Sequence, residues 1–71
     1  MDVYRRETRE VVRRFLENQL TFDSCIYSLD GALVRFIPRM KPGQLRELRI
    51  EMLANNEVVM KEMERRGREP T

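Results

Sequence analysis

The middle of the chain carries apolar residues at steps that alternate between four and three. The stripe consists of Phe22, Ile26, Leu29, Leu33, Phe36 and Met40. This spacing places all of its members on one face of an α-helix. Thr21 is suited to cap the start of such a helix, and Pro38 is suited to end it. The pattern therefore predicts a helix from Phe22 to about Ile37.

Similar stripes predict a helix on each side. The first runs from about Asp2 to Gln19, with a break over residues 18–21. Its apolar side comprises Tyr4, Thr8, Val11, Val12, Phe15, Leu16 and Gln19. The third starts at Pro42, a residue favoured in the first helical turn, and continues to about Arg66, with Gly67 as the stop. Its stripe comprises Leu45, Leu48, Met52, Val59 and Met63, with Leu53 and Met60 on the flank.

One alternative concerns residues 25–37. Asp30-Gly31 is a strong two-residue turn signal, so this segment has an alternative reading as a β-hairpin. In the hairpin, however, Ile26, Leu33 and Ile37 crowd the face that should meet water. The helix leaves only two apolar residues of the segment outside its buried face, so we favour the helix and keep the hairpin as the alternative.

The length and composition favour an all-α fold, a small three-helix bundle completed by homodimerisation. The chain has 71 residues, which suggests one helical domain over residues 1–67 and a frayed tail over residues 68–71. A core of this size is weak unless disulfides, a metal or self-association reinforces it. One cysteine and no histidine exclude an intrachain disulfide and the common zinc sites, so self-association is the expected reinforcement.

The third helix is the expected interface. At about 1.5 Å per residue it is about 37 Å long, against about 24 Å for the second, so its far end should project and expose Val59, Met60 and Met63 in a monomer. Asn56 falls in the apolar line and predicts a symmetric Asn56–Asn56 contact that fixes register. In the alternative, the helix is rotated so that Asn55, Asn56 and Arg49 touch water. The predicted interface residues are Leu48, Met52, Asn56, Val59, Met60 and Met63.

A basic strip on the first helix supports a second hypothesis. Its members are Arg5, Arg6, Arg9 and Arg13. They fall within about a 100° arc and are candidates for contacts with nucleic-acid phosphates. Acidic residues interleave with them, and the net charge of the whole chain is only +2, so a solvated face with local ion pairs is the favoured interpretation.

Catalytic chemistry finds little support in the sequence. Without histidine, Cys25 has no obvious activating base, and we expect it to be a small core residue. Glu47 and Glu51 lie one turn apart, but we place them on the solvated outer side of the third helix. No stretch matches a secretion signal or a membrane span. We therefore expect a cytoplasmic binding protein without cofactors, which is not an enzyme and acts by self-association and partner binding.

Overall fold

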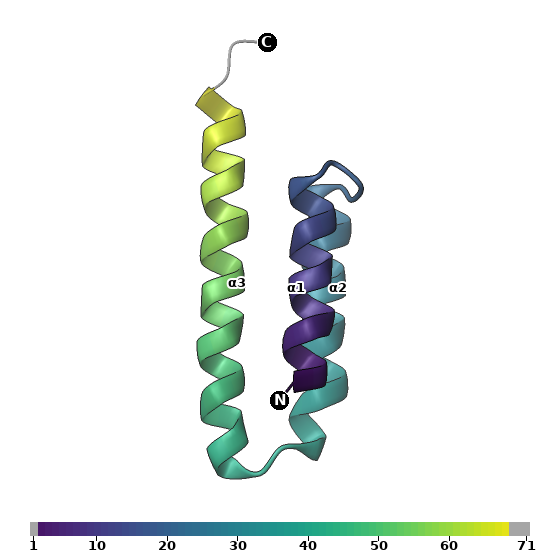
Figure 1. The fold of residues 1–71 in the computed structure, drawn as a ribbon, viewed down its shortest axis with the longest axis vertical. Coiled ribbons are helices and arrows are strands. Elements are labelled where there is room, and N and C mark those ends of the chain that lie inside the picture. The colour runs from purple at the N-terminus through teal and green to yellow at the C-terminus, as the bar shows by residue number, and fades with distance from the viewer. Residues whose placement is uncertain (1, 69–71) are drawn as a thin grey trace.

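The computed structural model describes residues 2–68 and consists of three long helices. The helices are α1 (Asp2–Leu16), α2 (Phe22–Phe36) and α3 (Pro42–Arg68), with a short 3₁₀-helix η1 (Ile37–Arg39) before α3. They run up, down and up, so α1 and α3 point the same way (Figure 1). The molecule is elongated, with extents of 46 × 18 × 16 Å. The prediction of an all-α three-helix bundle is confirmed, and the described residues contain no strand.

The first helix ends three residues earlier than predicted because Asn18 adopts a left-handed backbone conformation, with φ of 63°. The Asn18 amide donates to the Phe15 carbonyl at 3.1 Å, and the Gln19 amide donates to the Arg14 carbonyl at 2.7 Å. These two bonds form a Schellman motif, which satisfies carbonyls that the helix end would otherwise leave unpaired. Asparagine is the side chain that tolerates this conformation best after glycine.

The second helix follows the sequence prediction closely. The Thr21 hydroxyl accepts a hydrogen bond from the Ser24 amide at 3.1 Å, as expected of an N-cap. Asp30 and Gly31 lie within the helix, so the hairpin alternative is wrong. The α-helix ends at Phe36 and gives way to η1, in which Pro38 lacks the backbone N–H that would continue the α-helical hydrogen bonds.

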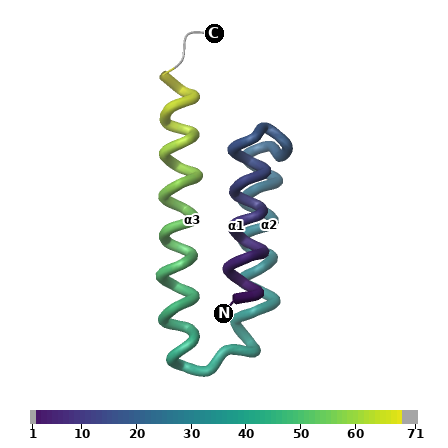
Figure 2. Tube along the Cα trace, viewed as in Figure 1, coloured from purple at the N-terminus to yellow at the C-terminus, as the bar shows by residue number. Residues whose placement is uncertain are grey.

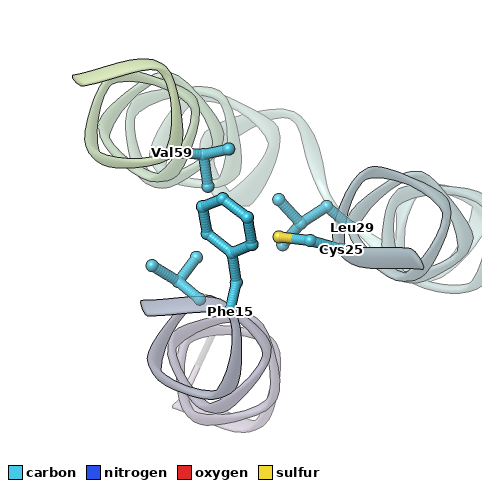
Figure 3. Packing of buried hydrophobic residues seen from close by; sticks show 5 residues of the cluster. Phe15, Cys25, Leu29 and Val59 are labelled. Atoms are coloured by element: carbon cyan, nitrogen blue, oxygen red, sulfur yellow. The ribbon is translucent and has the colours of Figure 1, made fainter. Parts of the chain in front are cut away.

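The core lies where the three helices meet, and α1 is the helix against which both others pack. Figure 3 shows the Phe15 ring of α1 pointing between Val59 of α3 and the pair Cys25 and Leu29 of α2. Phe15, Cys25 and Val59 have no exposed surface. A second cluster lies toward the other end of the bundle and contains Tyr4, Ala32 and Leu48. The packed core spans most of the length of α1.

The third helix is longer than predicted, and its C-terminal half is more buried than predicted. The helix passes through Gly67 to Arg68, so glycine does not end it and Arg68 does not belong to a frayed tail; residues 69–71 lie outside the described part. The expectation that Val59 is exposed in a monomer is wrong, because Phe15 covers it. Met63 packs against the same cluster, and only Met60 is largely exposed. Figure 2 shows that α3 still extends past the loop between α1 and α2.

Polar contacts join the C-terminal end of α3 to the C-terminal end of α1. The Arg66 guanidinium donates to the Phe15 carbonyl at 3.0 Å and lies 4.4 Å from the centre of the Phe15 ring. Glu62, one turn earlier, accepts from Arg66 at 2.7 Å and also pairs with Arg65. Arg66 thus adds a cation to the C-terminal end of α1, where the helix dipole favours positive charge. These contacts extend the packing of α3 against α1 to the C-terminal end of α1.

Within the described part of the chain, no helix has both the length and the apolar composition needed to cross a membrane.

Candidate interaction surface

The inward side of α3 differs from the predicted one by a rotation of about one residue. Its buried members are Leu48, Glu51, Asn55 and Val59, at steps of three, four and four. Asn56, which the sequence interpretation placed in the apolar line, is exposed, and so is Arg49. The alternative reading correctly rotated the helix, but Asn55 is buried and does not touch water as that reading expected.

Glu51 lies on this inward side and pairs with the basic strip of α1. Its carboxylate accepts from the Arg9 guanidinium at 2.9 Å and lies 3.5 Å from that of Arg5. The Glu51 side chain is 11% exposed, whereas those of Arg5 and Arg9 are 38% and 66% exposed. The prediction that Glu51 sits on a solvated outer face is therefore wrong. The three side chains instead join α1 to α3 across one edge of their contact.

The rest of the basic strip is engaged within α1 or isolated. Arg13 pairs with Glu10 and with Glu17 on its own helix, which holds the pKa of Glu10 below its ordinary value. Among the four arginines of the strip, only Arg6 forms no ion pair with the described residues. The structure thus places the four side chains along one helix but does not bring them together as a free basic patch.

Asn55 carries an unusual buried group. The residue is 6% exposed, and its amide nitrogen is buried without a hydrogen-bond partner among the described residues. It borders a cleft of about 60 Å³ between α2 and α3, which is also lined by Tyr4, Leu29 and Met52. Burial raises the pKa of the Tyr4 hydroxyl above its usual 10.0, and the Glu51 carboxylate raises it further. This end of the core is therefore more polar than the cluster around Phe15.

The side of α3 that points away from α1 and α2 carries a second pattern. It consists of Arg46, Ile50, Leu53, Glu57, Met60 and Glu64, which we call the outer face. The steps again alternate between four and three, so these residues share one side of the helix. Ile50, Leu53 and Met60 are 63%, 53% and 57% exposed. No other helix of the described chain lies on this side of α3 (Figure 1).

The predicted interface residues therefore divide into three groups. Leu48 and Val59 are core residues of the single chain, and Met52 and Met63 are partly buried. Asn56 and Met60 remain exposed. Ile50 was missed, and Leu53 was placed only on the flank, because the search followed the stripe that begins at Leu45. The alternating spacing of Ile50, Leu53 and Met60 is the sequence signal for the outer face.

Cys25, which the sequence predicts to be a small core residue, lies in the core. The residue is fully buried, and burial raises the pKa of its thiol above the usual value. The attacking form of cysteine is the thiolate, which this environment disfavours. Over residues 2–68, no three histidine, cysteine, aspartate or glutamate side chains gather in a way that could hold a metal ion.

Comparisons of the chain with protein-family models, with curated proteins and with solved structures give no match.

Proposed function

We propose that the protein is a small helical interaction module that acts by self-association through the outer face of α3. The observation that carries this proposal is the exposure of Ile50, Leu53 and Met60, each more than half accessible, on one side of a helix. Exposed apolar side chains grouped on one face and bordered by polar residues are typical of a surface that another protein covers. The partner we assign first is a second copy of the chain.

The proposal differs from the sequence hypothesis in where the surface lies. Val59 and Leu48 fill the core of the single chain, so they are not free to contact a partner. Met60 belongs to both versions, and the outer face adds Ile50 and Leu53 on the same side of the helix. The function remains that of a binding protein, and a buried thiol at Cys25 supports a reducing, cytoplasmic setting.

The nucleic-acid hypothesis gains no support from the arrangement of the arginines. Arg5, Arg9 and Arg13 form ion pairs with carboxylates of the same chain. Phosphate contacts would have to break these ion pairs first. We therefore propose no second function.

The test compares two substitutions of apolar residues by aspartate. Leu53→Asp places a charge in the middle of the outer face, whereas Val34→Asp places one at an α2 residue that is 73% exposed and remote from that face. We expect wild type and Val34→Asp to show a rise in mass by light scattering between micromolar and millimolar concentration. We expect Leu53→Asp to stay monomeric with an unchanged circular dichroism spectrum. A wild type that stays monomeric throughout, or a Leu53→Asp variant that associates normally, contradicts the proposal.

A further inference from the structure

We infer that two copies pair their α3 helices antiparallel, in the register that sets Arg46 opposite the partner's Glu64. This inference rests on the proposed function and adds the geometry of the partner. The core residues of a paired helix alternate between two kinds of position. In an antiparallel pair, each kind of position on one helix faces the other kind on the second helix. On α3 those positions are the six residues of the outer face.

The two ends of the outer face carry opposite charges, and they meet when one copy is reversed about residue 55. Ile50 then meets the partner's Met60, and Leu53 meets the partner's Glu57. At each end Arg46 meets the partner's Glu64, so opposite charges flank the contacts between Ile50 and Met60. Each contact occurs twice, as the two-fold symmetry of a homodimer requires.

The residues that flank the outer face fit the same alignment of the two helices. On each side they meet residues of the same side of the partner, so their pairing is offset by one residue from the reversal about residue 55. On the side nearer to α1, Glu47 faces the partner's Lys61, and the small residue Ala54 lies next to its own copy at the axis. On the other side, Asn56 faces the partner's Asn56. This register would place the symmetric Asn56 contact predicted from the sequence at the edge of the proposed interface, where the amides also reach water.

A parallel pair is disfavoured by the same charges. In parallel alignment, equivalent positions face each other, so Arg46 meets Arg46, Glu57 meets Glu57 and Glu64 meets Glu64. Like charges at facing positions destabilise helix pairs and are a common device for selecting orientation. Antiparallel alignment also sets the two helix dipoles against each other favourably.

The single chain leaves these charges available. Arg46 and Glu47 are exposed and form no ion pair with the described residues. Lys61 pairs with Glu57 at 2.9 Å, and Glu64 lies 3.5 Å from Arg68, but all four of these side chains are at least 65% exposed and free to rearrange. Because each copy contributes only three apolar residues and Glu57 lies among them, we expect weak association, with a dissociation constant of roughly 10–100 μM.

The experiment is a charge exchange between Glu47 and Lys61, followed by sedimentation equilibrium. Glu47→Lys alone and Lys61→Glu alone each turn two attractions into two repulsions, and we expect each to weaken the dimer about tenfold at low salt. The double variant Glu47→Lys/Lys61→Glu restores the attraction in this register and should return to within about threefold of wild type. Asp23→Lys, on α2, is the matched control and should leave association unchanged. Circular dichroism verifies that each variant is folded.

The outcomes separate this inference from the proposed function. Restoration in the double variant, with effects that shrink in concentrated salt, supports the antiparallel register. A double variant as weak as the single variants overturns the register, while self-association through the outer face stands if Leu53→Asp still abolishes it. A wild type that is monomeric at every concentration overturns both.

Discussion

Replacing the buried amide of Asn55 by a hydrocarbon should stabilise the protein. In Asn55→Leu, the branched side chain keeps the same number of heavy atoms, and the adjoining cleft of about 60 Å³ leaves room for its bulkier methyl groups. The exchange removes a buried donor that has no partner in the described chain. Such a group costs about 1–3 kcal/mol, so we expect the free energy of unfolding to rise by about 1–2 kcal/mol after imperfect packing is allowed for.

The assay is thermal and urea unfolding followed by circular dichroism at low micromolar concentration, where association contributes little. A gain of 1–2 kcal/mol corresponds to a rise in melting temperature of about 5–15 °C for a domain of this size. Asn56→Leu is the matched control, because the neighbouring residue is exposed and should change stability by less than about 0.5 kcal/mol. A loss of stability in Asn55→Leu, or a larger gain in Asn56→Leu, would refute the assignment of Asn55 to the inward side of α3.

Three further predictions concern the ion pairs. Arg65 and Arg66 lower the pKa of Glu62 from 4.5 to about 2, so the stability contributed by this carboxylate is present above pH 4.5 and is lost as the pH falls toward 2. Glu62→Gln should flatten that part of the stability–pH curve, and an unchanged slope in acid unfolding would contradict it. Arg66→Ala removes the contact with Phe15 and should cost about 1–2 kcal/mol, whereas Arg66→Lys should lose part of this because lysine lacks the planar guanidinium. Glu51→Gln should lower the pKa of Tyr4 toward 10.0 but leave it raised, since burial is the larger cause; ultraviolet titration in a Tyr27→Phe background measures it.

The sequence predicted α1 and α2 well because their signals agree with one another. In α2 the apolar spacing, the cap at Thr21 and the proline after Ile37 all indicate the same helix, and the structure contains it. The end of α1 was placed too late because the prediction gave the left-handed backbone of Asn18 no weight. A hydrogen-bonded C-terminal motif of this kind overrides the helical preference of the residues around it.

The rotation of α3 could not be read from the sequence because that helix carries apolar residues on two sides. Leu48 and Val59 belong to the inward side, whereas Ile50 and Leu53 lie on the outer face. Periodicity alone gives both sides similar weight. The contacts that decide between them are tertiary, above all the pairing of Glu51 with arginines far away in the chain. The hydrophobic pattern does not reveal which charged residue forms ion pairs between two helices.

The position of Phe15 has a consequence for how the protein is made. A ribosome completes α1 and α2 before it reaches α3, so the nascent hairpin of two helices carries an aromatic ring whose lid, Val59, has not yet been synthesised. Until Val59 emerges, the incomplete bundle exposes the apolar ring of Phe15 to its surroundings. The bundle therefore cannot close before Val59 has emerged, and translation that stops before Val59 yields a product prone to aggregation and proteolysis.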